Sequence, residues 1–159
     1  HSTLTGDFFV DECNVECDLH AFFPETYVPG ASERMLLYRE LDGLTTDEQI
    51  ADFRQCMTDR FGALPPEGEE LLRIVPLRRL GRKVGAERLT LKNGRMTLYF
   101  VSKYDSPFYQ SSTFDRLIQY ATQNYRTTEL KESAGKRRMV IKNVPTVERA
   151  LSLLQKITE

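Results

Sequence analysis

The side chains best suited to hold a metal ion lie close together near the start of the chain. They are Cys13, Cys17 and His20, with Asp11 or Asp18 as a fourth ligand. Structural zinc sites usually combine two close ligand pairs that a loop separates, and here there is one cluster without a second pair. Cys17 also alternates with Leu19, as expected for a strand position that faces a core. We therefore favour a core role for these residues and expect no metal site.

Catalytic patterns of other kinds are missing from the sequence. It has no Gly-rich phosphate loop, no nucleophile elbow and no His-Glu-x-x-His pair, and one of its two histidines is the first residue. Cys56 lies beside Met57 on the flank of a predicted helix, where the edge of a core is a more usual place than a nucleophile's. We expect a chain that is not an enzyme and that binds no cofactor.

An acidic helix face is the first candidate binding surface. Glu48, Asp52 and Asp59, together with Gln55, fall on one side of a helix predicted from about Thr46 to Phe61. The opposite side carries an apolar stripe: Ile50, Phe53, Met57 and Phe61. Most acidic faces are simply solvated. The alternative is an interface for a basic partner.

Basic residues form the second candidate surface. They cluster at Arg78, Arg79, Arg82 and Lys83, and again at Lys136-Arg137-Arg138. A solvated helix and hairpin surface is the simpler interpretation. The alternative is a sequence-independent, salt-sensitive contact with a phosphate backbone. No aromatic residues that could stack single-stranded bases are interleaved with these clusters.

The elements that would position these residues follow from the apolar periodicity. We expect a strand over Glu16 to Phe22, three helices (from Ser32 to Asp42-Gly43, from Thr46 to Phe61, and from Pro65-Pro66 to Val84), a hairpin about Asn93-Gly94, a helix over Phe114 to Ala121, strands over Thr127 to Lys131 and Arg138 to Val144, and a last helix over Val147 to Ile157. Thr46 and Gln49 form a capping box, Gly62 is a left-handed C-cap, and Pro76 predicts a kink or break in the third helix. This order predicts an α+β fold, with helices packed on a mostly antiparallel sheet.

Composition favours one ordinary globular domain. The chain has 159 residues, of which 40% are apolar and 28% charged, and its net charge is -1. We expect residues 1–14 to be a linker or tail and residues 15–159 to form the domain. The three cysteines indicate a reducing compartment, and no stretch is long and apolar enough to span a membrane. We expect a cytoplasmic protein without a membrane partner.

A run of short motifs resembles the C-terminal domain of bacterial transcription-repair coupling factors (Mfd). The most specific is Asp59-Arg60-Phe61-Gly62-x-Leu64-Pro65. Others follow the family's order: Val15-Glu16-Cys17-Asp18-Leu19-x-Ala21-Phe22-Phe23-Pro24, Glu33-Arg34-Met35-x-Leu37-Tyr38-Arg39, and Leu71-Leu72-x-Ile74 through Leu77-Arg78 to Lys83-Val84-Gly85. The resemblance is dense from Val15 to Gly85 and implies one domain of a much longer protein.

The resemblance also implies a function. In this family the C-terminal domain folds back on an N-terminal module that resembles the repair protein UvrB, and that module has a basic surface able to recruit UvrA. An acidic helix on that surface would mask it, with Asp59 the position carried over from the motif; Cys56 stands where the family commonly has another acid. Other parts of the parent protein would bind RNA polymerase, hydrolyse ATP and translocate on double-stranded DNA. We expect no direct DNA contact from this domain.

Overall fold

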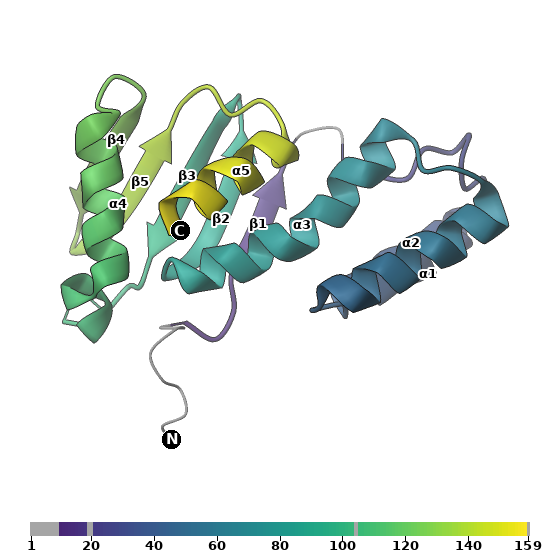
Figure 1. Ribbon diagram of the computed structural model, residues 1–159, viewed down its shortest axis with the longest axis horizontal. Coiled ribbons are helices and arrows are strands. Elements are labelled where there is room, and N and C mark those ends of the chain that lie inside the picture. The colour runs from purple at the N-terminus through teal and green to yellow at the C-terminus, as the bar shows by residue number, and fades with distance from the viewer. Residues whose placement is uncertain (1–9, 19–20, 104, 159) are drawn as a thin grey trace. The chain divides into compact units, whose positions relative to one another are not determined.

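A computed structural model describes residues 10–18, 21–103 and 105–158 (Figure 1). In chain order the elements are β1 (Asn14–Cys17), α1 (Ala31–Asp42), α2 (Asp47–Phe61), α3 (Pro66–Lys83), β2 (Ala86–Lys92), β3 (Arg95–Phe100), η2 (Pro107–Gln110), α4 (Ser112–Gln123), β4 (Thr128–Ser133), β5 (Lys136–Ile141) and α5 (Val147–Thr158). The predicted α+β class and the predicted order of elements are confirmed. Within this fold the described residues form two compact units, a helical unit within residues 21–76 and a sheet unit within residues 10–18, 77–103 and 105–158.

The sheet unit is built on five strands in the order β1-β2-β3-β5-β4. β1 runs parallel to β2, and the remaining neighbours are antiparallel. The predicted turn at Asn93-Gly94 joins β2 to β3, and both residues have positive φ, 55° and 73°, as a two-residue hairpin loop requires. β4 lies at one edge of the sheet.

One face of the sheet carries the core of this unit. Its buried strand residues are Leu89, Leu91, Met96, Leu98, Phe100, Met139 and Ile141. Figure 1 shows α4, α5 and the last part of α3 over the same face of the sheet. The apolar sides of α4 and α5 are buried there, as the periodicity predicts. The opposite face alternates with this one and bears polar side chains such as Arg88, Thr97 and Arg138.

The prediction of a strand over Glu16 to Phe22 is wrong in its bounds. β1 pairs with β2 from Asn14 to Cys17. Its ladder ends where β2 ends, because the chain turns back at Asn93-Gly94 and leaves no partner strand. Leu19 lies outside the described residues, and the N–H of Phe22 donates instead to the carbonyl of Glu67 at 3.2 Å.

The helical unit packs α1, α2 and the first part of α3 around a core of its own. Its buried residues are Phe23, Val28, Leu37, Leu41, Ile50, Phe53, Met57, Leu72 and Val75. The ring of Phe23 stacks on Tyr38 with 5.2 Å between centroids, and the hydroxyl of Tyr38 accepts the N–H of Phe23 at 2.9 Å. This ring pair ties the segment before α1 to the helices.

The two units divide α3 at Pro76. Leu72 and Val75 are buried in the helical unit, whereas Leu77 and Val84 are buried in the sheet unit. The predicted change of apolar face therefore marks the boundary between two cores. The predicted break does not occur, because α3 runs from Pro66 to Lys83 with Pro76 inside it. Proline has no N–H, so only the bond to the carbonyl of Leu72 is lost.

Candidate partner-binding site

The start of α2 is fixed by its own side chains. The hydroxyl of Thr46 accepts the N–H of Gln49 at 3.1 Å, and the Gln49 Oε1 accepts the N–H of Thr46 at 3.2 Å and that of Thr45 at 2.8 Å. This is the predicted capping box, which satisfies backbone donors that the first helical turn leaves unpaired. The acidic face therefore begins at a defined residue.

The end of α2 is held by Gly62 and by Tyr27. Gly62 has φ 91° and ψ -173°, and its N–H donates to the carbonyl of Thr58 at 2.9 Å. This conformation has the positive φ predicted for the cap, although its ψ lies outside the left-handed helical region. The Tyr27 hydroxyl donates to the Gly62 carbonyl at 2.7 Å and to the Met57 carbonyl at 3.3 Å.

The rotation of α2 about its axis is set by its apolar stripe. Ile50, Phe53 and Met57 are buried, and Phe61 is half-buried. Arg54 and Arg60, the two arginines of α2, form ion pairs with Glu69 of α3 and Glu33 of α1. Both cations are therefore directed to neighbouring helices.

The three predicted acids, Glu48, Asp52 and Asp59, are all exposed on the other side of α2. None of them forms an ion pair with any residue that the structure describes; Asp59 accepts one hydrogen bond, from Gln55 Nε2 at 3.0 Å. At 1.5 Å per residue, the eleven steps from Glu48 to Asp59 span about 16 Å. The arrangement is a row of exposed carboxylates that form no ion pair within the part of the chain that the structure describes. We call it the acidic row.

The residues of the motif around Asp59 have different structural roles. The guanidinium of Arg60 lies 4.7 Å from the centroid of the Phe61 ring, which is tilted against Tyr27 at 5.6 Å. Arg60 and Phe61 thus join α2 to the rest of the helical unit, and Gly62 ends the helix. Asp59 points to solvent, so it is the member of the motif that is available to a partner.

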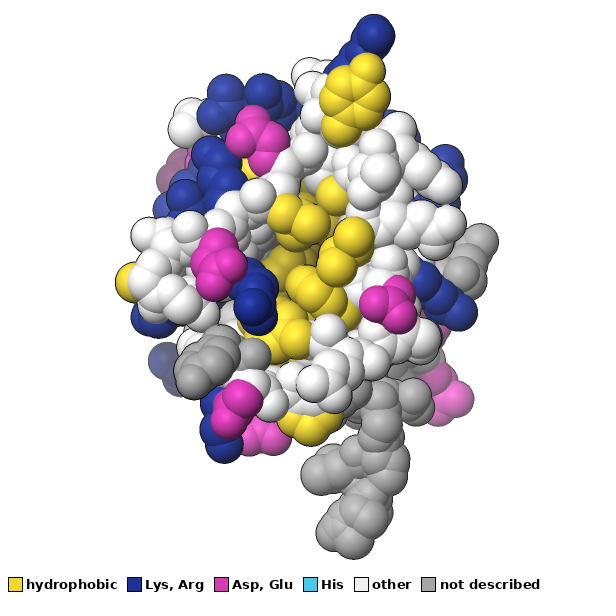
Figure 2. All heavy atoms as spheres, turned by 90° about the vertical axis from the view of Figure 1, so that its left-hand side faces the viewer, with side chains coloured by type: hydrophobic (Ala, Val, Ile, Leu, Met, Phe, Trp, Pro, Cys, Tyr) yellow, Lys and Arg dark blue, Asp and Glu magenta, His cyan; other side chains and the backbone are white. Residues whose placement is uncertain are grey.

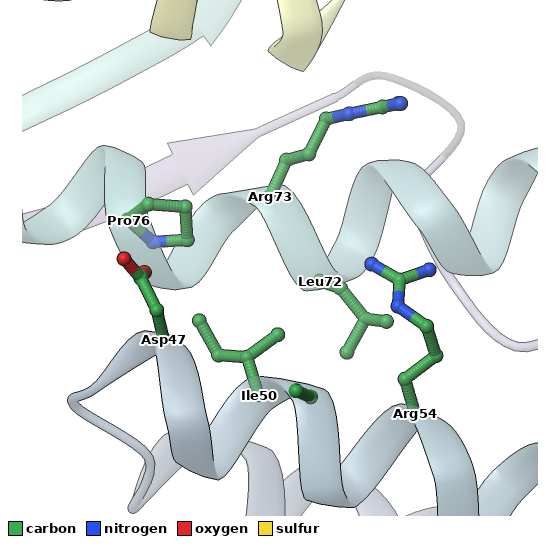
Figure 3. A pocket seen from close by; sticks show the side chains of 7 residues that line it. Asp47, Ile50, Arg54, Leu72, Arg73 and Pro76 are labelled. Atoms are coloured by element: carbon green, nitrogen blue, oxygen red, sulfur yellow. The ribbon is translucent and has the colours of Figure 1, made fainter.

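A small groove between α2 and α3 was not predicted from the sequence. It has a volume of about 230 Å³ and is lined by Asp47, Ile50, Ala51, Arg54, Leu72, Arg73 and Pro76. Figure 3 shows Ile50 of α2 and Leu72 of α3 pointing toward each other, whereas the guanidinium of Arg73 extends away from the gap between the two helices. Alternation of apolar and charged residues gives no hint of it, because the groove depends on how the two helices pack.

Cys56 lies elsewhere than predicted. Cys56 is exposed rather than at a core edge. Each residue of a helix is rotated by about 100° from the one before it, and this rotation places Cys56 nearer to the acidic row than to the apolar stripe. The resemblance implies an acid at this position, and this chain has a neutral, exposed side chain there.

The basic residues of α3 do not form an open patch. Arg78, Arg79 and Arg82 are half-buried in the sheet unit, and Lys83 is exposed. Arg78 and Arg82 lie near Cys13, a buried thiol whose pKa burial raises to about 12 although both cations lower it. Gly81 is needed at this contact, since a Cβ there would come within 2.5 Å of the Cys13 Sγ. In the second cluster Lys136 is exposed, and the guanidinium of Arg137 lies 4.4 Å from the Tyr109 centroid.

The metal-ligand candidates can be followed only in part. Cys13 is buried, Cys17 is half-buried, and His20 lies outside the described residues. Over residues 10–18, 21–103 and 105–158, no three His, Cys, Asp or Glu side chains are grouped to hold a metal ion. No helix in the same ranges is both long enough and apolar enough to cross a membrane.

Comparison with known proteins identifies the family of the chain. The family model described as the TRCF domain matches residues 17–111. The transcription-repair-coupling factor of Rickettsia prowazekii is 34% identical over 106 residues, and the match covers 58% of this chain and 10% of that protein. The factor of Escherichia coli is 26% identical over 83 residues, 52% of this chain and 7% of that protein. This chain thus spans at most about a tenth of these curated relatives.

A solved structure has the same fold. A crystal structure of the C-terminal domain of transcription-repair coupling factor superposes with a TM-score of 0.63 at 20% identity, covering 93% of this chain and 96% of that one. The family match extends over more than half of the chain, from the segment after β1 through α3 and the β2-β3 hairpin to η2. The chain therefore belongs to the TRCF domain family and has the fold of the C-terminal domain of a transcription-repair coupling factor.

Proposed function

We propose that this chain is a non-catalytic regulatory domain of a transcription-repair coupling factor, and that its acidic row covers a basic surface elsewhere in the same polypeptide. The surface belongs to the N-terminal module that resembles UvrB, and covering it keeps UvrA from binding. The parent protein is an ATP-hydrolysing DNA translocase that displaces stalled RNA polymerase. The observation that carries the proposal is the acidic row itself, three outward carboxylates that form no ion pair with any described residue of the chain.

Such a contact is weak enough to be reversible, as a regulatory interface requires. An exposed ion pair contributes only about 0 to 1 kcal/mol, so three pairs together contribute at most about 3 kcal/mol. Within one polypeptide the two surfaces meet at an effective concentration on the order of millimolar. Three pairs alone therefore correspond to a dissociation constant of about 6 mM, so contacts beyond the acidic row must add to them before most molecules close. The closed form is then lost when polymerase and DNA bind the open form better.

The groove between α2 and α3 belongs to the same helical unit as the acidic row. Its lining is apolar at Ile50, Ala51, Leu72 and Pro76 and charged at Asp47 and Arg54. A partner that sets cations on the acidic row can place one short apolar side chain there, which adds shape selection to a charge contact. Charge alone would not distinguish one basic surface from another.

Charge reversal tests the proposal. Glu48→Lys, Asp52→Lys and Asp59→Lys together should weaken binding to the isolated UvrB-like module and raise the affinity of the whole parent protein for UvrA. The matched control reverses three exposed acids of the sheet unit, Glu12, Asp105 and Asp115, and so changes net charge equally. The acidic row has no part in masking if its reversal leaves both affinities at the control's values.

Nucleic-acid binding through Arg78, Arg79, Arg82 and Lys83 has less support. The three arginines are half-buried, and each already interacts with other residues of the chain. Binding of labelled duplex DNA at low salt, weakening steeply as salt rises, would revive it.

A further inference from the structure

The edge strand β4 exposes both a backbone ladder and apolar side chains. β4 pairs with β5 on one side, and within the described part of the chain no strand pairs with its other side. Three large apolar residues on or next to it are exposed: Ile118 of α4 is 39% exposed, Tyr125 is 68% and Leu130 of β4 is 42%. Figure 2 views the side of the molecule on which β4 and α4 lie and shows hydrophobic side chains gathered along a hollow.

The direction of the backbone groups follows from one hydrogen bond. The N–H of Lys142 donates to the carbonyl of Thr127 at 2.7 Å, next to the β4-β5 register pair Thr128 and Ile141. Backbone direction alternates along an antiparallel strand, so Glu129 and Lys131 bond β5, while Leu130 and Glu132 direct their N–H and C=O groups to the open edge. An added strand would bond to those groups.

The charges on β4 select one way of adding a strand. Glu129 and Lys131 flank Leu130 and share the sheet face opposite to the helices, since Leu130 pairs with the buried Met139. If an identical strand is paired antiparallel with Leu130 opposite Leu130, each Glu129 faces a Lys131. Centring the pair on Glu129, Lys131 or Glu132 places like charges opposite each other, which is destabilising.

The register centred on Leu130 also satisfies the backbone. Leu130 directs its polar groups outward, so two copies of Leu130 form a hydrogen-bonded pair about a two-fold axis. Next to it, the N–H of each Glu132 reaches the carbonyl of a Thr128. On the helix side of the sheet the two Leu130 side chains lie against each other, which buries apolar surface that one chain leaves exposed.

We propose that β4 is a self-complementary interface, and that two copies of this chain pair through it into a continuous antiparallel sheet. The edge requires an acid-apolar-base triplet on the incoming strand, and its own sequence Glu129-Leu130-Lys131 is that triplet. The interface is short, so the dimer is weak, with a dissociation constant on the order of 0.1 to 1 mM for the isolated chain. This inference does not rest on the proposed function.

Sedimentation of the 159-residue chain between about 10 μM and 1 mM tests the pairing, because this range brackets the expected dissociation constant. The average mass should rise from that of one chain toward that of two. Glu129→Lys and Lys131→Glu should each raise the dissociation constant about tenfold, since each turns two attractive pairs into repulsive ones. The double variant restores opposite charges and should dimerise again. An equal mixture of the two single variants should form mixed dimers, because the lysines of one then face the acids of the other.

A cross-link tests the register. In a Cys56→Ser background, Leu130→Cys should form an intermolecular disulfide on oxidation, since residues of a hydrogen-bonded antiparallel pair lie about 5.5 Å apart. Glu132→Cys should not, because its partner is Thr128. A mass that stays at one chain up to the highest concentration overturns the proposal. So does a dimer that both single charge reversals leave intact, which would place the interface elsewhere.

Discussion

Among the glycines in the loops of the sheet unit, Gly85 should be the one whose replacement by alanine lowers the free energy of unfolding most. Gly85 joins α3 to β2 with φ 78°, and its carbonyl accepts the N–H of Val101 at 3.0 Å. A Cβ there would lie 2.6 Å from the Cζ of Phe108, whose ring is fully buried. Conformation and space therefore both oppose the substitution.

The cost can be built from two parts. A left-handed conformation costs alanine about 1–2 kcal/mol, and overpacking a filled core costs about 1–3 kcal/mol, so Gly85→Ala should lower the free energy of unfolding by about 2–5 kcal/mol. Gly62→Ala is the matched comparison. Gly62 also has a positive φ, 91°, but a Cβ there meets nothing within 4 Å, so strain alone should cost about 1–3 kcal/mol.

A double-mutant cycle separates the two parts. Urea unfolding followed by circular dichroism is suitable, because the chain has no tryptophan. Phe108→Leu makes room for the new methyl group, so it should recover about 1–3 kcal/mol of the cost of Gly85→Ala and none of the cost of Gly62→Ala. If the effects of Gly85→Ala and Phe108→Leu add to within about 0.5 kcal/mol, the clash inferred from the structure is wrong.

Two further predictions concern the capping box and the buried thiol. Thr46→Ala should lower the free energy of unfolding by about 1 kcal/mol and increase amide exchange in the first turn of α2. Thr46→Ser should retain most of the cap. Equal exchange in the wild type and both variants would contradict the role of the cap. Cys13 keeps its proton in the folded state to a pKa of about 12, whereas the unfolded thiol loses it near 9. Stability should therefore fall as the pH rises above about 9, by up to about 1.4 kcal/mol per pH unit, and Cys13→Ala should remove that component from the pH dependence of urea unfolding. Wild type and variant with the same slope above pH 9 would refute it.

Periodicity predicts those parts of this fold that local chemistry decides. The helix caps at Thr46 and Gly62 and the hairpin at Asn93-Gly94 lie within a few residues of the groups they bond. The outward direction of Glu48, Asp52 and Asp59 follows from the stripe of Ile50, Phe53 and Met57, because one helix period relates both sets. Such features need no knowledge of the distant chain.

Features set by distant pairing were predicted less well. The bounds of β1 depend on where β2, about seventy residues later, turns away. The division of α3 at Pro76 depends on which of two cores receives each apolar residue, although the switch of face between Val75 and Leu77 already marks the place. The groove at Ile50 and Leu72 and the edge position of β4 arise from the packing and order of elements, which periodicity does not specify.

Two charge patterns on this chain lead to different kinds of partner for the same physical reason. A row of one sign, as on α2, is balanced only by a surface of the other sign, so it selects a partner unlike itself. On β4 the acid Glu129 and the base Lys131 lie 3.7 Å apart within one chain, and an antiparallel copy of the strand presents the opposite charge to each of them. Raising the salt concentration should weaken both contacts. Only the amount of dimer formed through β4 should rise with the square of this chain's concentration, because that dimer needs two copies. Concentration dependence therefore separates the two interfaces in one sample, and charge reversal in either should leave the other unchanged.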